Sequence, residues 1–138
     1  MPAEEHRRGM AALATTSTQR LVTILDDDES LRRSLPELLG ALAVATRTFA
    51  SAEEFLDSGM VATTQCLILD VAMPEMSGPE LQQELVRRGH AVPIIFISGR
   101  TDDALRETLI GRGAIDCLVK PFSYERLRTA LEQAVGGL

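Results

Sequence analysis

Aromatic residues and cysteine are scarce in this sequence of 138 residues, which has no tryptophan, one tyrosine, four phenylalanines and two cysteines. A folded core must therefore consist mainly of aliphatic side chains. Cys66 and Cys117 lie in the apolar segments QCLILD and IDCLVK, where a free thiol usually behaves as a small buried hydrophobe. Two such cysteines exclude a disulfide framework and a cysteine-based metal site.

Long hydrophobic runs are absent as well. No run approaches the roughly 20 apolar residues that a helix needs to span a bilayer. The first residues, MPAEEHRRGMAALATTSTQR, contain acids and too short an apolar centre for a signal peptide. We therefore expect a cytoplasmic chain without a membrane segment.

Positive charge is in deficit, because 14 lysines and arginines face 20 aspartates and glutamates, which gives a formal net charge of -6. Binding to the phosphate backbone of a nucleic acid requires a surplus of basic side chains on one face. We therefore expect no direct nucleic-acid binding by this chain.

The length suits one domain. Residues 1–19 show no hydrophobic periodicity, and we predict a mobile N-terminal tail there and a single folded domain over residues 20–138. In that domain, apolar segments of strand length (21–26, 43–49, 66–70, 93–98 and 115–120) alternate with segments of helical period (31–42, 51–60, 78–89, 102–113 and 123–135). Five such units, with strands rich in Val, Ile and Leu, predict a parallel sheet covered on both faces, which is a doubly wound α/β fold.

Pro36 lies inside the first predicted helix, where its ring removes one backbone hydrogen bond. Two interpretations remain open at this point. Either the helix begins near Asp28 and bends at Pro36, or Ser34 and Glu37 form a capping box at which a regular helix begins later.

Polar residues follow four of the five predicted strands: Asp26 and Asp27 after the first, Asp70 at the third, Ser98 at the fourth and Lys120 at the fifth. The carboxyl ends of parallel strands meet at one edge of the sheet, where doubly wound folds gather their reactive groups. Three carboxylates suit a hard, oxygen-preferring cation such as Mg²⁺. The charges of Mg²⁺ and the lysine would cancel those of the acids, so a phosphoryl group would enter without net repulsion.

Each of these residues also has a simpler interpretation. Aspartates after strands often cap helices, and we assign that role to Asp28 and Glu29. Ser98 before Gly99 is compatible with a plain turn, and Lys120 with an exposed side chain. Independent turn residues have no reason to place three acids, a hydroxyl and an ammonium at neighbouring strand ends, so the joint pattern favours a functional site.

The segments DDDES, LDVAMPEMSG, FISGR and LVKPF, in this order and spacing, resemble the receiver domain of bacterial two-component response regulators over about residues 20–138. SAEEFL and GAIDCLVKPF are similar to the subgroup that is joined to LuxR-type helix-turn-helix output domains. The resemblance implies a flavodoxin-like sheet in the order 2-1-3-4-5. It also implies a signalling switch that catalyses only its own phosphorylation and dephosphorylation, rather than an enzyme with another substrate.

The resemblance assigns roles to the acidic residues. Asp70 would accept a phosphoryl group from a sensor histidine kinase in a Mg²⁺-dependent reaction. Asp27 and Asp70 would bind Mg²⁺ directly, Asp26 mainly through water, and Ala72 through its backbone carbonyl. Phosphorylation would then change the affinity for a downstream output domain or partner protein.

Ser98 and Lys120 would contact the transferred phosphoryl oxygens, and the bond between Lys120 and Pro121 would be cis. The family's switch couples such a Ser or Thr to an aromatic residue on the fifth strand, but the matching residue here is Cys117. Because cysteine is small, we hypothesise that the switch through Ser98 and Cys117 is muted or differently routed. The resemblance also allows a homodimer through the fourth helix and the fifth strand.

Two functions are alternatives to a phosphorylated signalling switch. A phosphatase with an aspartyl nucleophile would carry a second acid two residues later, where this sequence has Ala72, so no general acid is available. A degenerate receiver would act as a phosphorylation-independent interaction module, which Cys117 and the charged segment DDALRETLIGRGA would fit. The complete set of site residues argues against that alternative.

Overall fold

The computed structural model describes residues 20–138, so the tail predicted over residues 1–19 lies outside the described residues. Its centre is a five-stranded parallel sheet with the order β2-β1-β3-β4-β5. This confirms the predicted fold class and strand order. The strands are β1 (Arg20–Leu25), β2 (Val44–Phe49), β3 (Cys66–Asp70), β4 (Ile94–Ser98) and β5 (Asp116–Val119).

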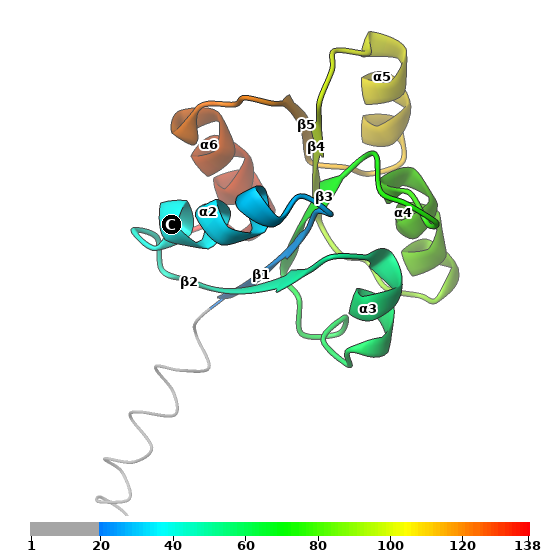
Figure 1. The fold of residues 1–138 in the computed structure, drawn as a ribbon, viewed down its shortest axis with the longest axis horizontal. Coiled ribbons are helices and arrows are strands. Elements are labelled where there is room, and N and C mark those ends of the chain that lie inside the picture. Colours follow the sequence, from blue (N-terminus) through cyan, green and yellow to red (C-terminus); the bar gives the residue numbers. More distant parts are fainter. Residues whose placement is uncertain (1–19) are drawn as a thin grey trace, which may run out of the picture.

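Five helices cover the two faces of the sheet. They are α2 (Glu29–Leu39), α3 (Ala52–Asp57), α4 (Gly78–Arg87), α5 (Asp103–Gly111) and α6 (Tyr124–Val135). Figure 1 shows α2 and α6 on one face and α3, α4 and α5 on the other. None of the helices in residues 20–138 combines the length and apolar content that a membrane crossing needs.

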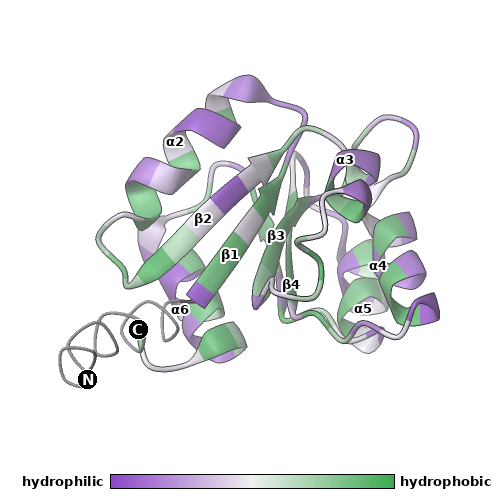
Figure 2. Cartoon of the chain, turned by 90° about the horizontal axis from the view of Figure 1, so that it is seen from below, coloured by the Kyte–Doolittle hydropathy of each residue, from purple (hydrophilic) through white to green (hydrophobic). Residues whose placement is uncertain are grey.

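The core has two parts, one on each face of the sheet. Phe55 of α3, Leu81 of α4 and Phe96 of β4 belong to one cluster, and Leu35 of α2 and Leu127 of α6 belong to the other. Strands β3 and β4 are buried along their whole length, as expected for central strands covered on both faces. Figure 2 shows these strands as hydrophobic, whereas the helices carry polar residues on their outer sides.

Both cysteines are buried and free, as predicted, with Cys66 fully inside the core. Burial raises the pKa of the Cys66 thiol to about 12, because a thiolate would lose its hydration in the apolar interior. This residue therefore contributes packing rather than reactivity.

Helix α2 resolves the two interpretations of Pro36. It begins at Glu29 and continues through Pro36 to Leu39, so the later start at a Ser34–Glu37 capping box is wrong. The reason lies at the N-terminus, where the side chain of Asp28 accepts a hydrogen bond from the backbone N–H of Ser30. This cap satisfies a donor of the first turn and starts the helix early.

Candidate functional site

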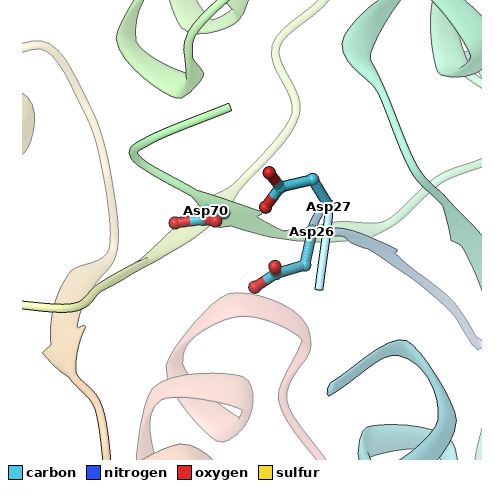
Figure 3. A group of neighbouring side chains, drawn as sticks. All are labelled: Asp26, Asp27 and Asp70. Carbon is cyan, nitrogen blue, oxygen red and sulfur yellow. The ribbon is translucent and has the colours of Figure 1, made fainter. Parts of the chain in front are cut away.

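Strand register brings the acidic residues together. Leu25 of β1 pairs with Leu69 of β3, so the residues that follow them, Asp26 and Asp70, lie at the same level at the carboxyl ends of the two strands. One carboxylate oxygen from each of Asp26, Asp27 and Asp70 lies within 4.8 Å of the others. Figure 3 shows the three carboxylates converging. The three carboxylates therefore lie close together at the carboxyl ends of β1 and β3.

Asp26 is fully buried, and its carboxylate and its backbone carbonyl both accept hydrogen bonds. Its Oδ1 accepts from the backbone N–H of Asp28 at 2.8 Å, and its Oδ2 lies 3.1 Å from the Nζ of Lys120. Its backbone carbonyl accepts from Nη1 of Arg32 in α2 at 2.7 Å. A buried carboxylate needs such partners, because leaving it uncompensated costs several kcal/mol.

Asp70 ends β3 and is only 5% exposed. Its Oδ1 accepts from the backbone N–H of Ala72 at 3.2 Å, and its Oδ2 lies 3.8 Å from Nζ of Lys120. Burial raises the pKa of Asp70 to about 6, and the negative charge of Asp26 adds to this, while Lys120 and the N–H of Ala72 oppose it. Burial is therefore the main reason that the protonated form of Asp70 is favoured, and repulsion from Asp26 is a further cause.

The donor set fits a divalent cation of the Mg²⁺ type. Three carboxylates offer hard oxygen ligands, and Asp27 is exposed, which leaves the site open to solvent. A bound cation would also offset the repulsion from Asp26, which adds to the effect of burial on the pKa of Asp70.

Lys120 is the single lysine of the 138 residues. Its backbone N–H donates to the carbonyl of Ser98 at 2.8 Å, and the following bond to Pro121 is cis, as predicted. The ammonium lies nearer to Asp26 than to Asp70, at 3.1 Å and 3.8 Å. It therefore bridges the two buried carboxylates.

Ser98 ends β4 and is 9% exposed. Its hydroxyl donates to the carbonyl of Arg100 at 2.9 Å and accepts from the N–H of Arg100 at 3.3 Å. The hydroxyl is therefore engaged in its own loop rather than with Asp70. A hollow of about 630 Å³ extends from Ser98 and Lys120 to Cys117 on β5.

The loop between β3 and α4 is held close to the site by Gly78. The N–H of Gly78 donates to the carbonyl of Val71 at 3.0 Å. A Cβ added here would collide with the backbone carbonyl of Asp70 and would crowd the Cα of Val71 and the ring of Phe96. Only glycine allows this close approach, which fixes the start of α4 against the end of β3.

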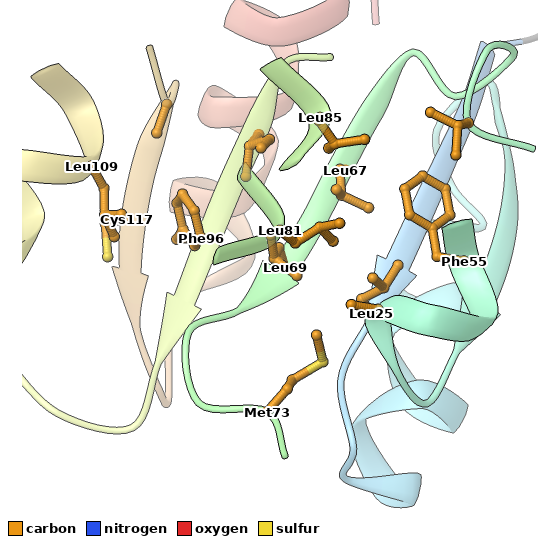
Figure 4. Packing of buried hydrophobic residues seen from close by; sticks show 14 residues of the cluster. Leu25, Phe55, Leu67, Leu69, Met73, Leu81, Leu85, Phe96, Leu109 and Cys117 are labelled. Carbon is orange, nitrogen blue, oxygen red and sulfur yellow. The ribbon is translucent and has the colours of Figure 1, made fainter. Parts of the chain in front are cut away.

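Cys117 lies on the edge strand β5 and packs in the same cluster as Leu109 and Phe96, as Figure 4 shows. Burial raises the pKa of its thiol, so the thiolate is disfavoured. Its carbonyl accepts from Nη1 of Arg106 in α5 at 2.7 Å, and Nη2 of Arg106 lies 2.9 Å from Asp116. The polar contacts of Arg106 thus add to the apolar packing of Leu109 between α5 and β5.

The structure brings Asp26, Asp27, Asp70 and Lys120 together, whereas the hydroxyl of Ser98 is turned to its own loop. Sequence reasoning missed Arg32 and Arg106. Arg32 lies in the first helical turn after the acids, which is a signal in the sequence. Arg33 follows directly and carries the same charge, so the sequence does not show which of the two reaches the site.

Comparisons with known proteins agree on one family. A family model described as "Response regulator receiver domain" matches residues 22–132. "Nodulation protein W" of Bradyrhizobium diazoefficiens is 39% identical over 127 residues, which cover 92% of this chain and 56% of that protein. "Transcriptional regulatory protein TdiR" of Thauera aromatica is 39% identical over 120 residues, which cover 87% of this chain and 53% of that protein.

A solved structure agrees with the fold. The crystal structure of a response regulator receiver protein from Burkholderia phymatum is 36% identical, with a TM-score of 0.75, and the match covers 87% of this chain and 98% of that one. The chain spans about half the length of the curated relatives it matches. The match therefore concerns the described fold and not the remaining half of those relatives.

Proposed function

The chain belongs to the receiver domain family of response regulators, which are phosphorylation-dependent signalling proteins, and from this premise we propose that Asp70 is its phosphoacceptor. The proposed receiver domain comprises residues 20–138. A sensor histidine kinase donates the phosphoryl group, and the resulting aspartyl-phosphate changes the affinity for an output domain or partner protein. The proposal rests on the convergence of three carboxylates and one ammonium at neighbouring strand ends.

The proposed chemistry is phosphoryl transfer from a phosphohistidine to a carboxylate. An Asp70 oxygen forms a bond to phosphorus while the bond from phosphorus to the imidazole nitrogen breaks, and the imidazole leaves with the bonding pair. Asp70 must be ionised to attack, and a nearby positive charge that lowers its raised pKa would increase the ionised fraction. The rigid end of β3 holds the nucleophile in place, which aligns the attack.

Asp27 and Asp70 would hold Mg²⁺ directly, with Asp26 acting mainly through water and Ala72 through its carbonyl. The bound cation would supply charge neutralisation for the phosphoryl oxygens. The carboxylate distances and the all-oxygen donor set support this assignment.

Lys120 and Ser98 are proposed to contact the phosphoryl oxygens. The ammonium of Lys120 lies 3.8 Å from Asp70, so a small movement away from Asp26 would bring it to a phosphoryl group there. The hydroxyl of Ser98 would exchange its hydrogen bond with Arg100 for one with the phosphoryl group. Ser98 also borders the hollow that leads to Cys117, which supports a switch along this route.

The proposed site of action is the cytoplasm, with no direct binding of nucleic acid by residues 20–138. Similarity to a protein named as a transcriptional regulatory protein supports an output in transcription. A homodimer would use α5 and β5, whose exposed sides carry the Arg106–Asp116 pair. The phosphorylation-independent alternative is motivated only by the small side chain of Cys117 and the charged segment DDALRETLIGRGA, which includes α5.

Beryllofluoride, which mimics a phosphoryl group on aspartate, tests this proposal without the kinase. In the presence of Mg²⁺ it should raise the melting temperature of the full chain, because a ligand that binds only the folded state stabilises it. The same addition to an Asp70→Asn variant should have no effect. Equal stabilisation of both proteins, or of neither, would contradict the proposal.

A further inference from the structure

Two adjacent arginines in the first turns of α2 have different surroundings. The guanidinium of Arg32 is half-buried, and its Nη1 donates to the backbone carbonyl of Asp26 at 2.7 Å. The guanidinium of Arg33 lies 2.9 Å from the carboxylate of Glu29, where both side chains are more than 70% exposed. Only Arg32 therefore reaches the acidic site.

The carbonyl that Arg32 contacts belongs to the peptide bond between Asp26 and Asp27. The other polar groups of Asp26 are also bonded: its N–H donates to Phe49 at 3.3 Å, and its carboxylate accepts from the N–H of Asp28 and pairs with Lys120. This peptide is therefore fixed at the point from which the Asp27 side chain projects.

Asp27 itself is exposed, unlike Asp26 and Asp70. An exposed carboxylate keeps its direction only if its backbone is held, because its side chain has little packing around it. Its oxygen nevertheless lies in the group whose members are within 4.8 Å of one another. The contact from Arg32 ties the first turn of α2 to the backbone of this group, in addition to the bond from the N–H of Asp28 to Asp26.

We propose that Arg32 is a positioning residue for the divalent-cation site, because it holds the Asp26–Asp27 peptide in the orientation that directs the Asp27 carboxylate toward Asp70. The inference rests on the proposed function only in that the site must bind a divalent cation. Arg32 acts through the backbone of the ligands and does not itself contact the ion.

A positioning role and a simple charge effect predict opposite results. Arg32 adds a positive charge next to three carboxylates, and removing it would by electrostatics alone strengthen the attraction for Mg²⁺. Removing a partner that orients the ligands weakens metal binding instead, typically by 10–100-fold. The sign of the change in Mg²⁺ affinity therefore separates the two.

The test is calorimetric titration of Mg²⁺ into the metal-free full chain, without any phosphoryl donor. Arg32→Met keeps an unbranched stem and a good helix former but has no donor. Arg33→Met changes the net charge equally one residue away and serves as the matched control. We expect Arg32→Met to bind Mg²⁺ about tenfold or more weakly than wild type. In the absence of metal it should melt only a few degrees lower, because one partly buried hydrogen bond is lost. Arg33→Met should bind at least as tightly as wild type.

An Arg32→Met affinity equal to or tighter than that of Arg33→Met would overturn the inference while leaving the proposed function intact. A wild-type chain that does not bind Mg²⁺ would overturn the cation site and the inference with it. If Arg32→Met does not fold, NMR of the wild-type protein provides the test, through the exchange of guanidinium protons with water. The guanidinium protons of Arg32 should exchange with water more slowly than those of Arg33, and equally fast exchange would overturn the inference.

Discussion

At the scale of single residues, the proposed chemistry depends on how charge is balanced around Asp70. Its carboxylate is buried beside Asp26, and this environment favours the protonated form. The ionised form is the nucleophile, so the same burial that shapes the site also opposes the state that reacts. Lys120 offsets part of this, at 3.8 Å from the Oδ2 of Asp70.

The stability of the metal-free protein should depend on pH through Asp70. Its pKa is about 6 in the folded protein against an ordinary value of 3.8, so its contribution to stability is full below the ordinary value and is lost as the pH rises through 6. Between pH 5 and pH 7 the loss should be of the order of 1 kcal/mol. Urea unfolding of wild type and Asp70→Asn at both pH values measures it.

The free energy of unfolding of Asp70→Asn should fall less over this range than that of wild type. Adding Mg²⁺ should reduce the difference in pH dependence between the two proteins, because the cation stabilises the ionised form of Asp70 in wild type. Parallel pH profiles of the two proteins without metal would show that the pKa of Asp70 is not raised.

Lys120 should contribute to stability as well as to the proposed chemistry. Its ammonium pairs at 3.1 Å with Asp26, which is fully buried, so Lys120→Met would leave that carboxylate uncompensated. We expect a loss of about 2 kcal/mol at neutral pH, less than for a fully buried pair because the lysine is partly exposed. Lys120→Arg keeps the charge and is the control in a denaturant titration.

Mg²⁺ should recover part of the stability that Lys120→Met loses, since the cation replaces the missing positive charge. A methionine variant as stable as wild type without metal would show that the pair with Asp26 contributes nothing.

At the scale of elements, the loop between β3 and α4 and the contact between α5 and β5 determine the surroundings of the site. Helix α4 begins against the last residues of β3 because Gly78 has no side chain. Its N-terminus is closed by a complete capping box, in which Ser77 and Glu80 each accept a backbone N–H. The end of β3 that carries Asp70 is therefore held from its C-terminal side.

Gly78→Ala should destabilise the fold by about 2 kcal/mol, because the added methyl group would force the backbone of Asp70 or the ring of Phe96 to move. Gly111→Ala at the end of α5 is the matched control, since nothing lies near its Cβ position. That variant should be neutral or more stable by up to about 1 kcal/mol, as expected for alanine in a helix. Thermal denaturation of both proteins gives the comparison, and equal melting temperatures would contradict the close approach.

The contact between α5 and β5 should depend on Arg106. Its guanidinium bonds to the carbonyl of Cys117 and pairs with Asp116, while Arg126 of α6 lies 3.8 Å from the same carboxylate. Arg106→Ala should cost about 1 kcal/mol, because the side chain is partly exposed. Hydrogen exchange should increase in α5 and β5 but not in α2, and uniform exchange across the three elements would contradict this role.

At the scale of the whole molecule, the fold could be predicted because each strand and helix has its own signal. The apolar runs of β3 and β4 match the fully buried strands, and the alternation with helical segments leaves few arrangements for a parallel sheet. Pro36 could not be resolved, because Asp28 and Ser34 are both good caps. The choice depends on the observed bond from Ser30 to Asp28.

The composition of the site could be predicted more readily than its bonding. Strand ends identify Asp26, Asp27, Asp70 and Lys120, because parallel strands bring them to one edge. Sequence alone does not show that Lys120 lies nearer to Asp26 than to Asp70, or that Ser98 bonds to Arg100. Those details follow from side-chain directions, and so does the difference between Arg32 and Arg33.

The role of Asp70 as phosphoacceptor is tested most directly by the intact mass of the full chain after incubation with acetyl phosphate, which donates a phosphoryl group without the kinase. With Mg²⁺ we expect one added phosphoryl group, and borohydride reduction followed by peptide mapping should locate it at Asp70. Without Mg²⁺, and in Asp70→Asn, no group should be added. A phosphoryl group on another residue, or equal labelling of Asp70→Asn, would contradict the assignment of Asp70 as the phosphoacceptor.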